Sequence, residues 1–151
     1  MLFRSDPAAS PVAHITRRYS FAASHRLHND ALPEEENWRV YGKCNNPYGH
    51  GHNYALEVTV AGPIDPATGM VVNLADLDRA VAEEILERFD HTNLNVDVES
   101  LRHTVPTSEN LLLAIHRLLS ERWDREPGLR RARLAGVRLQ ETGANSFELV
   151  G

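Results

Sequence analysis

The sequence is poor in cysteine and lysine and has no long apolar run. One cysteine, Cys44, excludes an internal disulfide and fits a reducing compartment. Lys43 is the sole lysine, and the net charge of -5 argues against a nucleic-acid partner held by a basic face. No stretch approaches the ~20 apolar residues that cross a bilayer. We therefore expect a cytoplasmic protein with neither a nucleic-acid nor a membrane partner.

The length suits one domain with a modest core. Of the 151 residues, 42% are apolar and 25% are charged, as in ordinary globular proteins. Residues 1–14 contain Pro7 and Pro11 and lack the apolar segment of a signal peptide. We expect a disordered tail at residues 1–12 and a single domain over residues 13–151.

Hydrophobic periodicity predicts the secondary structure. Alternating apolar and polar residues predict strands at 12–25, 53–61, 70–74, 131–141 and 146–150. Apolar residues at helical spacing predict one helix at 75–89 and another from Pro106 to Pro127-Gly128, and a polar, irregular loop is expected at 28–43. This order of elements predicts an α+β domain with two helices on one face of an antiparallel sheet. Because the edges of so small a sheet need covering, identical subunits are expected to pair.

The segment around His50 and His52 carries the strongest chemical signal. Residues i and i+2 of a strand point to the same face, so these two imidazoles can bind one ion. His25, at the end of another alternating run, supplies a third nitrogen. Three histidines without a fourth protein ligand leave a coordination position open, which suits a catalytic zinc better than a structural one.

Cys44 lies six residues before His50, and its sequence neighbours Lys43, Asn45 and Asn46 are polar. Next to Lys43 and a divalent ion, a thiolate would have a lowered pKa. The residue could then serve as a fourth metal ligand, a nucleophile or a general base, and the sequence does not separate these three roles.

Three further residues have side chains suited to proton transfer or to ligand binding. Asp90 could orient the imidazole of His91, which could relay protons. We expect that such adjacent residues do not pair directly but reach toward a third group. Glu141 ends an apolar strand before a turn, where its carboxylate could accept two parallel hydrogen bonds from an amidine-like N–H pair, as pterins and guanines present.

In combination, these motifs resemble the 6-pyruvoyltetrahydropterin synthase/6-carboxytetrahydropterin synthase family. The matching segments are 21–27, 41–47, 49–54, 64–71, 73–77, 90–91, 93–94, 107–110 and 141–142. The resemblance extends from about Ile15 to the end of the sequence. It implies a tunnelling fold (T-fold), in which a four-stranded antiparallel sheet carries two helices on one face. It also implies a homohexamer of two stacked trimers whose sheets close into a barrel.

The resemblance also implies a role for each candidate residue. His25, His50 and His52 are the expected zinc ligands, one Zn²⁺ per subunit, and Cys44 is the expected general base. Asp90 and His91 complete a triad with Cys44 from a neighbouring subunit. Glu141 and Glu109, with Thr107 beside them, hold the pterin ring.

The implied reaction converts 7,8-dihydroneopterin triphosphate to 6-pyruvoyltetrahydropterin and inorganic triphosphate, without a nicotinamide or flavin. The sequence leaves open whether Mg²⁺ accompanies the triphosphate. It also leaves open which basic residue binds the triphosphate, with Arg17, Arg18, Arg26 and Lys43 as the candidates.

Two other functions compete with this one. The first is 6-carboxytetrahydropterin synthase of queuosine biosynthesis, which uses the same substrate and also releases acetaldehyde. Features closer to the pyruvoyl enzyme are the long loop 28–43, the five-residue spacing between Cys44 and His50, and segments 45–47 and 73–74. Features closer to the carboxy enzyme are 94–95 and 106–109. The second is a non-catalytic zinc- or pterin-binding protein, which would need the histidines but not Cys44, Asp90 or His91.

Overall fold

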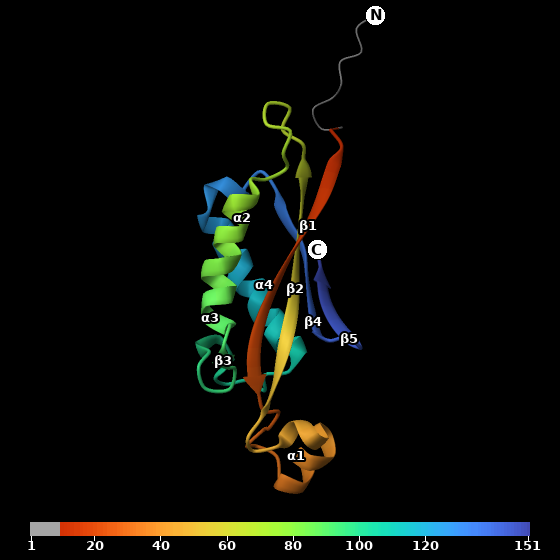
Figure 1. The fold of residues 1–151 in the computed structure, drawn as a ribbon, viewed down its shortest axis with the longest axis vertical. Helices are drawn as coiled ribbons and strands as arrows, with labels where there is room; N and C mark the ends of the chain where they lie inside the picture. The colour runs from red at the N-terminus through yellow and green to blue at the C-terminus, as the bar shows by residue number, and fades with distance from the viewer. Residues whose placement is uncertain (1–9) are drawn as a thin grey trace, which may run out of the picture.

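A twisted sheet forms the centre of the molecule (Figure 1). The computed structural model describes residues 10–151. The strands are β1 (Val12–His25), β2 (His50–Pro63), β3 (Thr92–Asn93), β4 (Arg133–Thr142) and β5 (Asn145–Val150), in the order β3-β1-β2-β4-β5. The four long strands are antiparallel, as predicted, but two-residue β3 pairs parallel to β1. The sheet is therefore mixed and five-stranded rather than four-stranded.

β1 and β2 pair along their whole length. The register runs from Val12 opposite Pro63 to His25 opposite His50. The predicted strand at 12–25 is confirmed, and the strand predicted at 53–61 extends at both ends. Of the predicted tail at 1–12, residues 1–9 lie outside the described part of the chain, and β1 already begins at Val12.

The strand predicted at 70–74 does not form. A turn precedes it, closed by hydrogen bonds from the Gly69 amide to the Asp65 carbonyl and from the Asp65 amide to the Met70 carbonyl. Val71 and Val72 are then buried one after the other, without the alternation of a strand. The second neighbour of β2 in the sheet, besides β1, is β4 instead.

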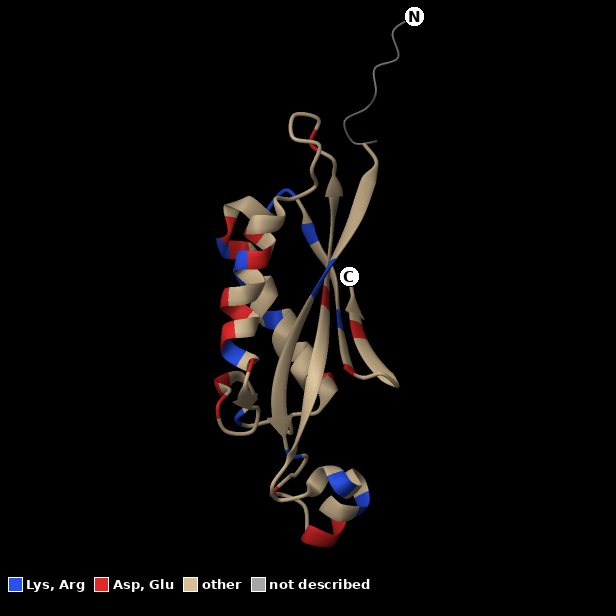
Figure 2. Cartoon of the chain, in the orientation of Figure 1, with Lys and Arg blue, Asp and Glu red and all other residues tan. Residues whose placement is uncertain are grey.

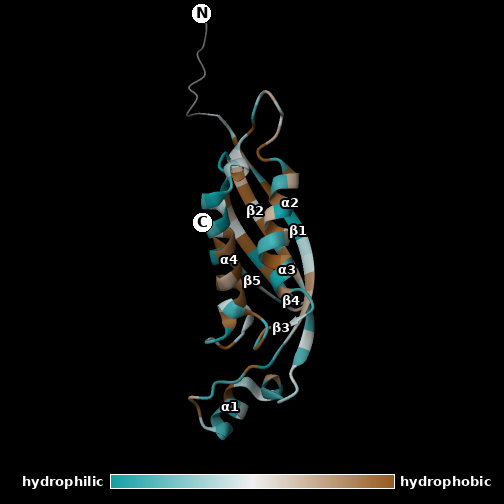
Figure 3. Cartoon of the chain, turned by 90° about the vertical axis from the view of Figure 1, so that its left-hand side faces the viewer, coloured by the Kyte–Doolittle hydropathy of each residue, from teal (hydrophilic) through white to brown (hydrophobic). Residues whose placement is uncertain are grey.

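Two helical segments lie side by side in one layer and cover one face of the sheet, as predicted (Figures 1 and 3). The first runs through α2 (Leu74–Val81), a π turn (Ala82–Leu86) and α3 (Glu87–Phe89), and the second is α4 (Ser108–Arg125). Short 3-10 turns lie at Glu99–Leu101 and Pro127–Leu129. The core between sheet and helices includes Leu56, Val58, Val60, Leu77, Ile85, Leu111, Ile115 and Leu119. No helix within residues 10–151 is both long enough and apolar enough to span a membrane.

The segment expected to be an irregular loop contains a helix, α1 (Glu34–Tyr41), followed by a 3-10 helix (Gly42–Asn45). Both lie beyond one end of the sheet (Figure 1). We call residues 28–45 the α1 lobe. Asn37 is buried there and holds the lobe together: its side-chain amide donates to the carbonyls of Asn29 (3.0 Å) and Leu32 (3.2 Å), and its side-chain oxygen accepts from the Asn29 amide (2.8 Å). A single polar side chain thus orders a segment whose apolar pattern is weak.

Charged side chains of both signs are interspersed along α2, α3 and α4 (Figure 2). Glu84 is 5% exposed and lies 3.2 Å from Arg122 and 3.1 Å from Arg88. Arg122 also pairs with Glu83 (2.7 Å) and Glu126 (3.0 Å), so it joins α4 to the π turn between α2 and α3. A buried carboxylate needs such partners because desolvation of an unpaired charge is costly.

We predict that Arg122→Ala lowers the free energy of unfolding by about 2–3 kcal/mol, because it leaves Glu84 buried with fewer partners. Urea unfolding followed by circular dichroism measures the change. Arg102→Ala is the matched control: it removes an exposed pair with Glu99 and should cost less than about 1 kcal/mol. Equal effects of the two substitutions would contradict the structural role given to Arg122.

Candidate active site

Three histidines meet at one end of the β1–β2 pair. The register places His25 opposite His50 and Ala23 opposite His52, and all three rings lie on the helix-covered side of the sheet with buried Tyr54. Their ring centroids are 4.6–5.0 Å apart, and one ligand nitrogen from each lies within 4.8 Å of the others. The prediction that His50 and His52 share a face with His25 is confirmed.

The backbone before β2 brings His50 to His25. Gly49 has a φ of +71°, and a Cβ at this position would lie 2.9 Å from the His25 carbonyl oxygen. Only glycine tolerates both the left-handed conformation and the close approach. Gly49 therefore permits the turn from which His50 begins the strand.

The ring of His25 is oriented by a backbone carbonyl. Its Nδ1 lies 2.8 Å from the Pro106 oxygen, and because a carbonyl only accepts, Nδ1 carries the proton. The other nitrogen, Nε2, then offers its lone pair and lies 3.0 Å from Nε2 of His50. Burial lowers the pKa of His25 and of His52, which favours the neutral, ligating form.

These residues fit a divalent cation. Nε2 of His52 is buried and has no hydrogen-bond partner within residues 10–151. Nitrogens on a tetrahedral ion with bonds of 2.0–2.1 Å would lie about 3.3 Å apart, close to the spacing of the His25 and His50 nitrogens. Three imidazoles without a fourth protein ligand in the group match the donor set of a catalytic zinc site.

Glu141 lies beside the histidines. One carboxylate oxygen, Oε1, is 3.8 Å from Nε2 of His52. The other, Oε2, accepts a hydrogen bond from the hydroxyl of Ser108, the first residue of α4. The β4–β5 register shifts between Gln140 and Thr142, so Glu141 is the extra residue of a bulge, a device that re-aims a side chain. The positive end of the α4 dipole favours a carboxylate here.

Sequence reasoning missed Ser108 and Tyr54. Ser108 belongs to the helix start at 106–109, but only the fold brings it to Glu141. Tyr54 follows His50 and His52 at the same spacing of two, and that spacing was the available signal. The Tyr54 side chain is 1% exposed, and its hydroxyl has no partner within the described residues. Burial, and secondarily the charge of Glu141, raise the pKa of Tyr54.

Thr107 and Glu109 lie at the start of α4, on either side of Ser108. Thr107 caps α4, and its hydroxyl accepts from the Asn110 amide at 3.2 Å. Glu109 is exposed in the first turn of α4, and within residues 10–151 it makes no hydrogen bond or ion pair.

Cys44 lies in the 3-10 helix of the α1 lobe and is half-buried. Its carbonyl accepts from the Leu27 amide at 2.8 Å. The carbonyl of the next residue, Asn45, accepts from Nε of Arg26 at 3.0 Å. The backbone of Cys44 is thus tied to the segment that directly follows His25.

The Asp90–His91 pair differs from the expectation. The two side chains do interact directly: Nδ1 of His91 lies 3.0 Å from Oδ1 of Asp90. His91 has a φ of +58°, which turns adjacent side chains toward each other in a way that extended backbone does not. The hydrogen bond from the Ala22 amide (2.8 Å), then the contact with His91, lower the pKa of Asp90.

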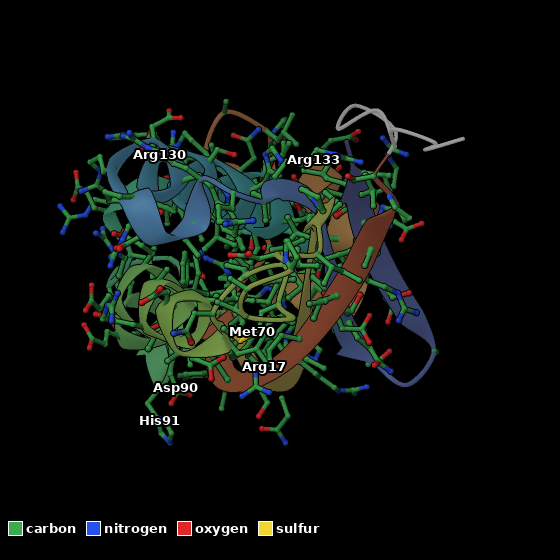
Figure 4. The ribbon with its side chains drawn as sticks, turned by 90° about the horizontal axis from the view of Figure 1, so that it is seen from above. Arg17, Met70, Asp90, His91, Arg130 and Arg133 are labelled. Carbon is green, nitrogen blue, oxygen red and sulfur yellow. The ribbon has the colours of Figure 1, made fainter. Side chains whose placement is uncertain are left out.

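His91 points away from the body of the molecule (Figure 4), and its side chain is 84% exposed. It borders an open hollow of about 460 Å³ that His52 also lines. Asp90 and His91 are thus displayed at the surface, at the edge of the sheet where β3 pairs with β1.

The basic residues considered for the triphosphate differ in their partners. Arg17 makes two hydrogen bonds to Asp78, of 2.9 and 2.8 Å, and Arg18 lies 3.9 Å from Glu57. Lys43 is exposed, with no hydrogen bond or ion pair of its side chain within residues 10–151.

Comparisons with known proteins agree on one family. The family model described as 6-pyruvoyl tetrahydropterin synthase matches residues 14–151. A Poecilia reticulata protein named 6-pyruvoyl tetrahydrobiopterin synthase is 49% identical over 141 residues, which cover 93% of this chain and 91% of the relative. The structure of Caenorhabditis elegans 6-pyruvoyl tetrahydropterin synthase has a TM-score of 0.85 and 39% identity, and the match covers 94% of this chain and 97% of that one.

A protein of Archaeoglobus fulgidus, provisionally named 6-carboxy-5,6,7,8-tetrahydropterin synthase, is 41% identical over 86 residues. That match covers 57% of this chain and 66% of the relative. The fold, the clustered histidines and the family match over residues 14–151 agree, and the chain belongs to the 6-pyruvoyl tetrahydropterin synthase family.

Proposed function

We propose that the protein is a zinc-dependent lyase that converts 7,8-dihydroneopterin triphosphate to 6-pyruvoyltetrahydropterin and inorganic triphosphate. The observation that carries this proposal is the convergence of His25, His50, His52 and Glu141 at one end of the β1–β2 pair. Three imidazole nitrogens and a neighbouring carboxylate can hold a metal and a nitrogen-rich ring side by side.

The three histidines would hold one Zn²⁺ through their lone pairs. When bound, the ion would polarise the hydroxyl-bearing carbons of the substrate side chain and so acidify their C–H bonds. The contact between Nδ1 of His25 and the Pro106 carbonyl would keep that ring in its ligating orientation.

Glu141 would bind the N–H pair of the pterin ring. Ser108 occupies one lone pair of Oε2, so Oε1 and the rest of Oε2 remain available to accept. Because Glu141 lies 3.8 Å from His52, a ring held by this carboxylate would place its substituent near the histidines. Thr107 and Glu109 would complete the ring site.

Cys44 would act as the base that removes carbon-bound protons, and Asp90 with His91 would relay those protons. The contact of Asp90 with His91 suits such a relay, because the carboxylate orients the imidazole. The relay would come from a neighbouring subunit: His91 is exposed and bonds its own Asp90, so it is accessible to another chain.

The chain would assemble as a homohexamer of two trimers with sites between subunits. Within residues 10–151, β1 pairs on its outer side only at Ala23 and Ser24, and β5 forms the opposite edge of the sheet. Joining such edges between copies would close the sheets into a barrel and pair the free backbone groups.

The second candidate function is 6-carboxytetrahydropterin synthase. The similarity to the archaeal relative favours it, as do segments 94–95 and 106–109. The pyruvoyl reaction is preferred because the Poecilia reticulata relative, more similar and matched over nearly the whole chain, carries that name. A non-catalytic binding protein would not require Cys44, Asp90 and His91 together.

The product distinguishes the two reactions. We expect zinc-loaded protein, incubated anaerobically with 7,8-dihydroneopterin triphosphate, to give a pyruvoyl pterin and free triphosphate by mass spectrometry, without acetaldehyde. A carboxy pterin with acetaldehyde would assign the protein to the second reaction. No turnover by zinc-loaded protein would contradict both.

We predict that His52→Ala lowers bound zinc from one equivalent per chain by at least tenfold, because two imidazoles hold zinc much less tightly than three. Inductively coupled plasma mass spectrometry after dialysis gives the stoichiometry. His103→Ala, at an exposed position, is the control and should keep one equivalent. Full zinc content in the His52 variant would exclude it as a ligand.

Cys44→Ala should lower the single-turnover rate by about 10²–10⁴, the usual contribution of a general base, while zinc content stays at one equivalent. Parallel measurements of zinc and of triphosphate release separate this role from metal binding. If zinc were lost, Cys44 would be a ligand instead. If neither quantity changed, the assignment of the base would be wrong.

A further inference from the structure

Tyr54 has a buried hydroxyl that no residue in the described part of the chain satisfies. The side chain is 1% exposed, and the hydroxyl has no hydrogen-bond partner within residues 10–151. Buried hydroxyls in folded proteins nearly always have a partner, so such a group calls for a specific explanation. Phenylalanine would fill the same volume without an unpaired donor.

The Tyr54 ring is held in place from two sides. It stacks on Phe21 with a centroid distance of 5.0 Å and an interplanar angle of 17°, and it meets the His52 ring at 5.6 Å and 67°. A ring packed in this way cannot swing away to find water. The position of the hydroxyl is therefore fixed by the same β1–β2 pairing that fixes the histidines.

The sheet register places Tyr54 next to Glu141. Ala55 of β2 is opposite Gln140 of β4, and Tyr54 and Glu141 are the next positions along these two antiparallel strands. Nε2 of His52, 3.8 Å from Oε1 of Glu141, also lacks a hydrogen-bond partner within residues 10–151, but the proposed metal accounts for it. The Tyr54 hydroxyl and the Glu141 carboxylate are then the polar groups at this place that a ligand ring can hydrogen-bond.

We propose that Tyr54 is a further positioning residue for the pterin ring, with its hydroxyl donating to the ring carbonyl next to the N–H pair that Glu141 binds. This inference rests on the proposed function. In pterins and guanines that carbonyl directly adjoins the N–H pair, so one edge offers two donors and an acceptor. A carboxylate with a neighbouring hydroxyl complements all three, and a hydroxyl has a free donor where a carboxylate has none.

The test uses Tyr54→Phe, which keeps the stacked ring and removes only the hydroxyl. We expect 7,8-dihydroneopterin, titrated by fluorescence onto the zinc-loaded protein, to bind about 3- to 10-fold more weakly. KM should rise more than kcat falls, and zinc content should not change. The melting temperature should stay constant or rise by about 2–4 °C, since an unsatisfied buried group is lost.

Tyr19→Phe is the matched control. The Tyr19 hydroxyl donates to Asp78 at 2.7 Å, so its removal breaks a hydrogen bond that the fold makes. This variant should lose stability while binding 7,8-dihydroneopterin as the wild type does. The two variants are thus expected to move stability and affinity in opposite ways.

The results separate the two claims. If the wild type binds the ring and Tyr54→Phe binds it equally well, the role of Tyr54 is wrong and the proposed function stands. If Tyr54→Phe instead loses stability as Tyr19→Phe does, the hydroxyl is structural and the inference is also wrong. If wild-type protein neither binds 7,8-dihydroneopterin nor turns over its triphosphate, the proposed function fails, and this inference with it.

Discussion

The site depends on the register between β1 and β2. This pairing places His25 opposite His50 and, two positions further along, Ala23 opposite His52. A slip of one residue would turn the affected side chains to the opposite face, and a slip of two would move His25 about 7 Å along the sheet from its partner. The apolar face packed on the helices opposes the first slip, because it would expose residues such as Tyr54. The close backbone approach at Gly49 fixes where the strand begins.

Near the histidines, the fold buries polar groups that lower its stability. Within residues 10–151, Nε2 of His52 and the hydroxyl of Tyr54 are buried without hydrogen-bond partners, and Glu141 is partly buried next to them. Each unpaired buried group costs about 1–3 kcal/mol. The extensive core and ion-pair clusters such as that of Glu84 and Arg122 supply the stability that offsets this cost. An apolar core at this end of the sheet would be more stable but would have nothing with which to bind a ligand.

Local periodicity was enough to predict the faces of the long strands and the two helical segments, and hence the histidine cluster. It failed where one side chain or one dihedral angle decides the structure. The α1 lobe is organised by the hydrogen bonds of Asn37, which have no periodic signal. The direct contact of Asp90 with His91 requires a positive φ at His91. The contact of Ser108 with Glu141 joins residues 33 positions apart, and only the packing of α4 on the sheet brings them together.

The arrangement also separates two tasks. The three histidines and Glu141, proposed to bind metal and ring, lie on rigid, paired strands, where small errors in position are least tolerated. Thr107 and Glu109, proposed to complete the ring site, lie at the start of α4. The groups proposed to move protons are carried elsewhere: Cys44 in the α1 lobe beyond the sheet, and His91 on an exposed turn beside β3. Because the exposed imidazole of His91 contacts Asp90 of its own chain, it is accessible to a site on another chain. If the subunits assemble as proposed, association would bring a relay to a binding site already formed within each chain, so that folding would prepare the site and assembly would activate it.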